Sequence, residues 1–378
     1  MLGPLRQWWT QSSHSQLIHS QDKLFQRLLA NHPFTNSKVA GLNSVSFENP
    51  NSVGDTTVIL AHGFGSGLGF FFANVQHLLR QSSVRNVVLV DWKGMGGSDR
   101  PNCRGRPIRG LTEASTSWCD SRFTPAQSVK FFIDPFHEWM QHQQTTIDSF
   151  HSGRTILLGH SLGGYLSARY MMEYGSESGI NSLVLASPVG FPIKPDTVLV
   201  GRQLPTSLRV VDALWSANFT PQQLVRMMGS TRGRRSTHRA LMGRIPHLDP
   251  ESVELLAEYL YHITVGPGSG EFAMNSLLEP AVSTETMGIY AREPLQAIMP
   301  SQVEGQLLKN SDKASLARIK VLFGDHDWMR PNEPSARETM KEITKQTGLS
   351  TSVDIIPNAG HHLYVDNPVD FTRHLLSD

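Results

Sequence analysis

Cysteine is scarce in this chain of 378 residues, which contains only Cys103 and Cys119. Both lie in a segment rich in Gly, Arg and Ser. Two cysteines are too few for the disulfide framework of a small secreted domain, and their setting does not fit a thiolate metal site. The sequence therefore predicts a protein of a reducing, intracellular compartment.

Net charge is nearly absent, because 34 Lys and Arg residues stand against 33 Asp and Glu residues. This balance excludes a strongly basic nucleic-acid binder, so nucleic acid is not an expected partner. Charged residues make up only 18% of the chain, below the norm of about 25% for soluble proteins. Such a weakly charged surface suits a lipid interface, although composition alone does not establish one.

Long apolar runs are missing as well. No stretch reaches the length of about 20 residues that a membrane-crossing helix needs, and the N-terminus lacks the apolar block of a signal peptide. We expect residues 1–40 to form an N-terminal amphipathic helix or a leader. Its apolar side chains recur near helical spacing at Leu17, Ile18, Leu24, Phe25, Leu28 and Leu29.

Two interpretations of this N-terminal segment stay open. Trp8 and Trp9 precede the apolar positions, and such rings suit a peripheral membrane surface. The few acids and many Ser and Gln residues also resemble a mitochondrial leader, so the expected location is a mitochondrial or cytoplasmic membrane surface. The alternative is a helix that packs on the body of the protein.

The order of apolar runs predicts the fold class. At about 150 residues per domain, the length allows two domains or one large α/β domain with an insertion. From residue 56 onward, short apolar runs alternate with longer mixed segments, as in a mostly parallel sheet flanked by helices. The expected strands are Thr56–Ala61, Asn86–Val90, Thr155–Leu158, Ser182–Ala186, Ile319–Phe323 and Ser352–Ile356.

Between about residues 191 and 310 the β-branched runs give way to Gly and Pro breaks, which indicates a helical cap inserted between strands. We therefore predict a first part of an α/β core over 41–190, a helical cap over 191–310, and a second part of the core over 311–378.

The strongest motif is Gly159-His160-Ser161-Leu162-Gly163, which directly follows an expected strand. A G-x-S-x-G sequence at a strand-to-helix junction makes a sharp turn that needs glycine flanks, and it presents the serine hydroxyl at the top of the sheet. Ser161 is therefore the predicted nucleophile. A merely structural turn is the alternative, and the strand before the motif argues against it.

A serine hydroxyl becomes a nucleophile when a base removes its proton and a carboxylate orients that base. After an elbow of this type, the acid precedes the histidine in the chain. We favour Asp327 as the acid, because Asp325 lies close enough to its strand to shape the turn. His361 and His362 follow the next strand, and spacing alone leaves them nearly equal. This chemistry needs no metal and no redox cofactor.

The oxyanion formed by such an attack needs two hydrogen-bond donors. The sequence Ala61-His62-Gly63-Phe64-Gly65 follows the first strong strand, and its glycines would let the backbone approach a substrate. The N–H groups of Phe64 and Leu162 are the predicted oxyanion hole.

At these residues the chain resembles the α/β-hydrolase superfamily. More narrowly, it resembles the lipid-active branch that includes the lipid-droplet lipase coactivator, the N-acyl phospholipid hydrolases and the fungal mitochondrial cardiolipin deacylases. The narrower resemblance spans most of the chain and rests on Trp8-Trp9-Thr10, 62–67, 91–101, the elbow, 269–273, 290–295, and His361 with Asp366. It implies an α/β-hydrolase fold and, because Ser161 is intact, an active enzyme.

The family pattern places the base directly after Gly360, which selects His361. It also implies a possible acyltransferase motif, H-x-x-x-x-D, formed by His361 and Asp366. A carboxylate that orients the loop or caps the next helix is the alternative for Asp366. Extra residues at Pro280–Gly288 depart from the family pattern.

The expected cap is rich in arginine, and its stretch without any acid contains Arg226, Arg232, Arg234, Arg235, Arg239 and Arg244. Of these, Arg232, Arg234, Arg235 and Arg239 are the possible headgroup-binding residues. Clustered guanidinium groups can hold the phosphate of a lipid headgroup. The alternative is a solvated cap surface, which is the usual meaning of a charge run.

The resemblance implies a serine hydrolase that deacylates a phospholipid, of the phospholipase A or lysophospholipase type, with cardiolipin among the substrates it suggests. Two other functions stay open. One is an acyl-CoA-dependent lysophospholipid acyltransferase, and the other is a lipase-binding scaffold or coactivator at lipid surfaces.

Overall fold

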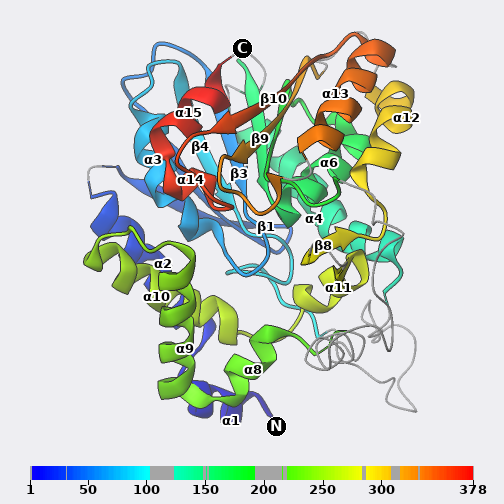
Figure 1. The fold of residues 1–378 in the computed structure, drawn as a ribbon. Helices are drawn as coiled ribbons and strands as arrows, with labels where there is room; N and C mark the ends of the chain where they lie inside the picture. The colour runs from blue at the N-terminus through cyan, green and yellow to red at the C-terminus, as the bar shows by residue number, and fades with distance from the viewer. Residues whose placement is uncertain are drawn as a thin grey trace.

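The computed structural model describes residues 2–30, 32–102, 123–147, 150, 153–191, 215, 219–282, 287–307, 316–330 and 333–377. Within these residues an eight-stranded sheet has the order β1-β2-β4-β3-β5-β6-β9-β10 (Figure 1). Its strands are β1 Phe34–Val39, β2 Leu42–Glu48, β3 Thr56–Ala61, β4 Val84–Val90, β5 Thr155–His160, β6 Ser182–Ala186, β9 Arg318–Gly324 and β10 Ser350–Ile356.

The sheet is mostly parallel, as predicted. Strand β2 runs antiparallel to both of its neighbours, β1 and β4, and every other neighbouring pair is parallel. Strands β4 and β5 flank β3 on opposite sides, so the direction of strand order changes at β3. In open α/β sheets a ligand site lies outside the carboxyl ends of the strands at such a point.

Helices cover both faces of the sheet, because alternate side chains of its strands are apolar in both directions. Val58 and Leu60 of β3 pack in one core layer, whereas Ile59 and Ala61 pack in the other. The helices of the core are α3 Phe72–Leu79, α4 Pro125–Thr146, α6 Leu162–Tyr174, α13 Glu333–Thr347, α14 Leu363–Asp366 and α15 Pro368–Leu376.

Between β6 and β9 the chain forms the expected cap. Its elements in the described residues are α8 Pro221–Met227, α9 Gly229–Arg244, α10 Pro250–Val265, α11 Gly270–Leu277 and a hairpin of β7 Leu278–Val282 and β8 Met287–Ala291. The described residues of Pro280–Gly288 are 280–282 and 287–288, which belong to β7 and β8, so this part of the cap is not purely helical. Helix α12 Leu295–Leu307 was expected in the cap, but it packs on α6 and α13 of the core.

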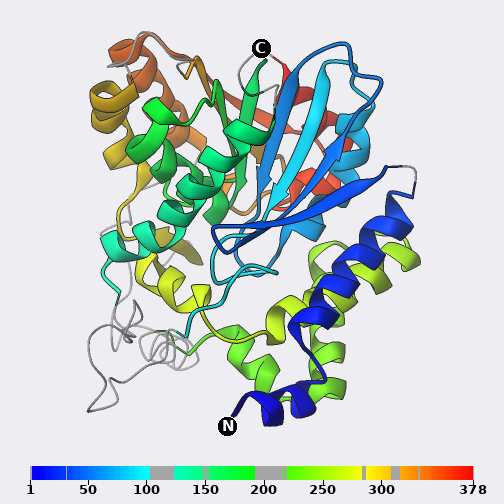
Figure 2. The same cartoon turned by 180° about the vertical axis from the view of Figure 1, so that it is seen from behind.

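Two N-terminal helices, α1 Leu2–Thr10 and α2 His14–Leu28, lie against α9 and α10 of the cap (Figures 1 and 2). The Trp9 indole donates to the carbonyl of Arg226, and Ser12 lies 2.8 Å from the His262 ring. An ion pair of 2.7 Å joins Arg27 to Glu251. The N-terminal segment is therefore an extension of the cap.

One predicted boundary is wrong. The N-terminal helical segment was expected to reach residue 40, but α2 ends at Leu28 and residues 34–39 form β1 of the main sheet. The reason is that β1 pairs along its whole length with β2. Ala40 and Gly41, both at positive φ, form the tight turn between the two strands.

No helix in the described ranges combines the length and the apolar character needed to span a membrane. Cys103 and Cys119 lie outside the described residues, so the prediction about their redox state stays a prediction.

Candidate active site

Ser161 occupies the sharp turn between β5 and α6. Its φ is +53°, a strained conformation for a residue other than glycine. The turn is possible because its flanks carry no side chain. A Cβ at Gly159 would lie 2.3 Å from the Gly163 carbonyl oxygen, and one at Gly163 would lie 2.4 Å from the carbonyl oxygen of His62. The elbow therefore presses directly against the loop after β3.

The structure brings Ser161, His361 and Asp327 together. The His361 Nε2 atom lies 3.2 Å from the Ser161 hydroxyl, and its Nδ1 lies 3.2 Å from Asp327 Oδ1. Asp327 has a fully buried side chain, and His361 is mostly buried. Because Nδ1 faces a carboxylate, we assign the ring proton to Nδ1, which leaves Nε2 to accept the serine proton.

A second serine joins this group, and no sequence motif marks it. Ser187, the residue after β6, donates its hydroxyl to Asp327 Oδ2 and lies 2.9 Å from His361 Nδ1. Burial alone would raise the pKa of Asp327. Hydrogen bonds from His361, Ser187 and the Met329 amide, with the charge of His361, hold that pKa below its usual value instead.

The neighbouring histidines differ in environment from His361. His362 is buried, and burial with the nearby His160, His361 and Arg244 lowers its pKa well below the usual range. Burial, and then the charge of His361, lowers the pKa of His160 to about 3. His160 is thus neutral, and its Nε2 donates to the His361 carbonyl over 2.8 Å. Geometry therefore favours His361 over His362 as the partner of Ser161.

Asp325, the alternative acid, faces the backbone just before His361. Its carboxylate accepts hydrogen bonds of 2.9 Å from the amides of Asn358 and Ala359, just before His361. Burial acts to raise its pKa, but these two amides and His326 lower it to about 2. Asp325 therefore shapes the turn that carries His361, and among the described contacts it pairs with the His326 ring and not with the His361 ring.

Asp366 also contacts the backbone around the base. Its Oδ2 accepts the Gly360 amide over 2.8 Å, and its Oδ1 lies 3.6 Å from His247 of the cap. Burial raises the pKa of this carboxyl above its usual value. This geometry fits the loop-orienting alternative for Asp366.

The predicted oxyanion donors lie beside Ser161. A Cβ on Gly63 would approach the Ser161 Cβ to 3.0 Å, so the loop that carries Phe64 touches the nucleophile. Leu162 is the first residue of α6, where a helix leaves its amides without an intrahelical acceptor. Within the described residues, neither the Phe64 amide nor the Leu162 amide donates a hydrogen bond.

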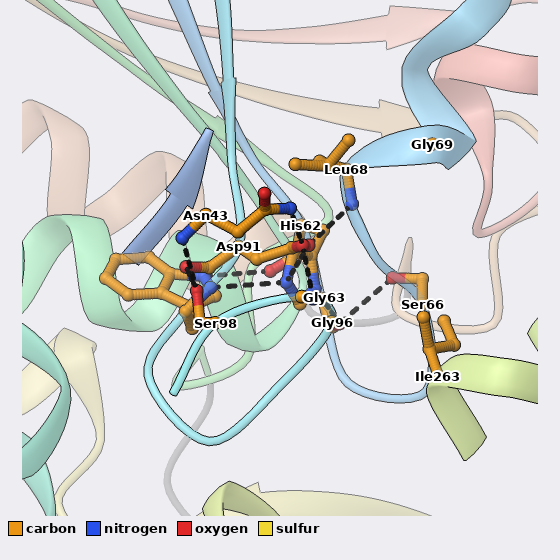
Figure 3. Close-up of polar contacts among 12 residues, drawn as sticks. Asn43, His62, Gly63, Ser66, Leu68, Gly69, Asp91, Gly96, Ser98 and Ile263 are labelled. Carbon is orange, nitrogen blue, oxygen red and sulfur yellow. Dashed lines mark hydrogen bonds and ion pairs between the residues drawn. The ribbon is translucent and has the colours of Figure 1, made fainter. Parts of the chain in front are cut away.

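A buried carboxylate, Asp91, fixes the loop of the predicted oxyanion hole (Figure 3). It accepts hydrogen bonds of 2.8 Å from the Leu68 amide, the Gly97 amide and the Asn43 side chain, and lies 3.3 Å from His62 Nε2. Burial would raise the pKa of Asp91, but His62 and these donors lower it on balance. The carboxylate therefore stays charged and joins β2, the loop after β3 and the loop after β4.

The four predicted headgroup arginines lie on α9. Arg232, Arg235 and Arg239 are exposed. Arg234 forms an ion pair with Glu258 and lies 4.3 Å from the centre of the Tyr261 ring. The side chain of Arg234 is thus engaged within the cap. None of the four contacts Ser161, His361 or Asp327 in the described part of the chain.

Among the described residues, no group of three or more His, Cys, Asp and Glu side chains has an arrangement suited to a metal ion. The site described above is a serine, an imidazole and a carboxylate at the carboxyl ends of β5, β9 and β10.

The family model of the alpha/beta hydrolase fold matches residues 56–368. The chain belongs to this family. Among curated relatives of this α/β hydrolase, 1-acylglycerol-3-phosphate O-acyltransferase of Arabidopsis thaliana is 29% identical and aligns over 89% of this chain and 69% of its own length. The human 1-acylglycerol-3-phosphate O-acyltransferase ABHD5 is 26% identical, with 84% and 76% covered.

A third relative of this α/β hydrolase is the (lyso)-N-acylphosphatidylethanolamine lipase of Bos taurus, 27% identical over 83% of this chain and 76% of its own. The resemblance to lipid-active members of the family is thereby confirmed. Carboxylesterase CesB of Bacillus subtilis has the same fold, with a TM-score of 0.51, 14% identity, and 96% and 97% of the two chains covered. A bacterial membrane phospholipase A does so as well, with a TM-score of 0.52, 19% identity, and 96% and 89% covered.

The contacts of Ser187 predict a pH-dependent loss of stability. Ser187→Ala removes a hydrogen bond to a buried carboxylate, so we expect the free energy of unfolding at about pH 7 to fall by about 1.5–3 kcal/mol. The pKa of Asp327 is depressed in the folded state, so its contribution is present at neutral pH and is lost as the pH falls through that pKa. The deficit should therefore narrow below about pH 4, as measured by urea unfolding.

The matched control is Ser167→Ala, since the buried hydroxyl of Ser167 has no hydrogen-bond partner in the described part of the chain. This variant should lose little stability at any pH. A deficit in Ser187→Ala that is equally large at neutral and acidic pH would contradict the assigned hydrogen bond.

Proposed function

We propose that the chain is a serine hydrolase that deacylates a phospholipid, of the phospholipase A or lysophospholipase type. The observation that carries the proposal is the continuous contact from Ser161 through His361 to Asp327, with both histidine contacts at 3.2 Å. A serine, an imidazole and a buried carboxylate in this order are the groups that acyl transfer to a serine requires.

In the proposed reaction, Ser161 Oγ attacks the ester carbonyl while His361 Nε2 accepts its proton. His361 then protonates the leaving alcohol, and Asp327 stabilises the imidazolium that forms in between. The amides of Phe64 and Leu162 hold the oxyanion. Water attacks the acyl-enzyme in the second half of the reaction, again with His361 as the base.

Two observations support a lipid substrate. The relatives named above are called acylglycerophosphate acyltransferases and an acylphosphatidylethanolamine lipase. The cap also borders a cavity of about 1010 Å³ whose walls include Trp9, Phe219, Met227 and Phe272. The walls of this cavity also include Arg6, Arg100 and Arg226, and Ser161 and His361 are not among them. Its volume is large enough for an acyl chain.

An acyl-CoA-dependent lysophospholipid acyltransferase is the second candidate. It is favoured by the names of the relatives and by the spacing of His361 and Asp366. In such an enzyme Ser161 would accept the acyl group from a thioester, and a lysophospholipid hydroxyl would replace water. The loop contact of Asp366 with Gly360 favours hydrolysis over a dedicated role of this carboxylate in transfer.

Both enzyme functions require Ser161, and this sets the first experiment. We expect the purified chain to react with a fluorophosphonate probe and to release fatty acid from at least one member of a phospholipid panel that includes cardiolipin and lysophosphatidate. Ser161→Ala and His361→Gln should lower both activities at least about 10³-fold. Addition of acyl-CoA and a lysophospholipid to the same panel separates transfer from hydrolysis.

His326→Gln is the matched control, because the His326 ring is exposed and pairs only with Asp325 among the described residues. It should retain wild-type activity. If the folded wild type neither reacts with the probe nor releases fatty acid, the hydrolase proposal is wrong and a lipase-binding scaffold becomes the better account.

We also propose that the enzyme acts at a membrane surface, mitochondrial or cytoplasmic. The support is an exposed apolar surface on α1 and α8. Trp8 is 75% exposed and Met227 is 67% exposed, and Leu5 and Trp9 are exposed beside them. Exposed α9 arginines adjoin this surface, and cations favour an anionic bilayer.

Trp8→Gln should lower binding to vesicles of mixed neutral and anionic phospholipid by roughly 3- to 10-fold, because an indole that reaches the interface is lost. Turnover of a short, soluble ester should not change. The control Val53→Gln replaces an equally exposed apolar residue outside the cap. Equal vesicle binding by both variants in a flotation assay would exclude this surface as the membrane contact.

A further inference from the structure

Arg244 is the α9 arginine that reaches the loop of the predicted oxyanion hole. It is the last residue of α9, and its guanidinium donates to the carbonyl of Gly65 over 3.1 Å. A Cβ on Gly65 would lie 3.4 Å from Arg244 Nη2. Gly65 directly follows Phe64, so the Arg244 cation lies beside one of the two proposed oxyanion donors.

The charge of Arg244 is not neutralised by a carboxylate within the described residues, and its side chain is exposed. Arg226 and Arg234 differ in this respect. Arg226 forms two hydrogen bonds of 2.7 Å with Glu271, and Arg234 pairs with Glu258. The positive charge of Arg244 also acts on His362, beside the proposed base, where it contributes to the low pKa of that ring.

The same end of the cap also touches the opposite wall of the site. His247, three residues after Arg244, lies 3.6 Å from Asp366, whose other oxygen accepts the Gly360 amide. The cap segment 244–247 therefore contacts both the loop of the oxyanion hole and the loop that carries His361.

Arg244 lies nearer to the proposed oxyanion hole along α9 than the four headgroup candidates do. At about 1.5 Å per residue, Arg239 lies roughly 7 Å and Arg232 roughly 18 Å farther from the site along the helix axis. In a glycerophosphate ester, only the glycerol unit separates the acyl carbonyl from the phosphate. A cation that binds this phosphate must therefore lie close to the oxyanion hole, as Arg244 does.

We infer that Arg244 binds a phosphate group of the substrate while the acyl carbonyl lies at Ser161, and so selects phosphate-bearing esters over neutral ones. This inference rests on the proposed function of Ser161. An arginine suits the task because its planar guanidinium can donate two parallel hydrogen bonds to one phosphate. The phosphate of a lysophospholipid satisfies this spacing. A phosphate of coenzyme A is separated from its thioester by the pantetheine arm, so it would reach Arg244 only with the thioester away from Ser161, and the two sources are distinguished below.

The test compares two esters with the same acyl chain, a short-chain lysophosphatidate and the corresponding monoacylglycerol. Arg244→Gln should lower kcat/KM for the lysophosphatidate by about 10- to 100-fold, the effect of losing a charge-assisted hydrogen bond, and should change the monoacylglycerol value by less than about threefold. Arg80→Gln is the control, because Arg80 is also an exposed arginine at a helix C-terminus. This variant should match the wild type on both esters.

Binding in a Ser161→Ala background keeps the inference separate from catalysis. The Arg244→Gln change should weaken calorimetric binding of the lysophosphatidate, and a parallel titration with acyl-CoA shows which source of phosphate Arg244 binds. If the chain with Ser161 intact shows no turnover but the lysophosphatidate binding depends on Arg244, only the hydrolase proposal is wrong. Three results would overturn the phosphate site. They are an equal loss of kcat/KM on both esters in Arg244→Gln, unchanged binding of both phosphate ligands, and a loss of lysophosphatidate turnover in Arg235→Gln in place of Arg244→Gln.

Discussion

The buried carboxylate of Asp91 is the interaction on which the geometry of the site depends. A charge without solvent is stable only when donors surround it, and Asp91 obtains its donors from three separate segments, around Asn43, His62–Leu68 and Gly97. The loop after β3 is thereby fixed against the serine elbow, where Gly63 and Gly163 permit backbone contact. Loss of this charge would release the loop that carries Phe64.

The same network connects the N-terminal helices to the site. Asn43 donates to Asp91 and also to Gln21 of α2 through its amide nitrogen. Helix α2 buries Leu17, Leu24 and Phe25, and α1 carries the exposed tryptophans. A surface that suits lipid and the loop of the proposed oxyanion hole are thus joined by a short chain of buried polar groups, and the cap extends from one to the other.

Local patterns in the sequence were sufficient for the core strands and for the order of serine, acid and histidine. Strands β3 and β6 begin and end at the predicted residues. Strands β1 and β2 were both missed. Thr35, Asn36, Ser37 and Lys38 give β1 no apolar alternation, and Asn43, Ser44 and Ser46 interrupt the apolar residues of β2. Ser187 was not assigned to the site because its contacts with Asp327 and His361 arise only when β6 packs beside β9. Arg244 was not among the four headgroup candidates because its contact with Gly65 arises only when the end of α9 packs on the loop after β3. The catalytic roles themselves stay predictions.

The most direct test of the account is a crystal structure of the chain after reaction with a phosphonate ester. We predict a covalent bond from phosphorus to Ser161 Oγ, with the phosphoryl oxygen within hydrogen-bond distance of the Phe64 and Leu162 amides and His361 Nε2 beside Oγ. A phosphoryl oxygen directed away from both amides, or phosphorus on another residue, would contradict it.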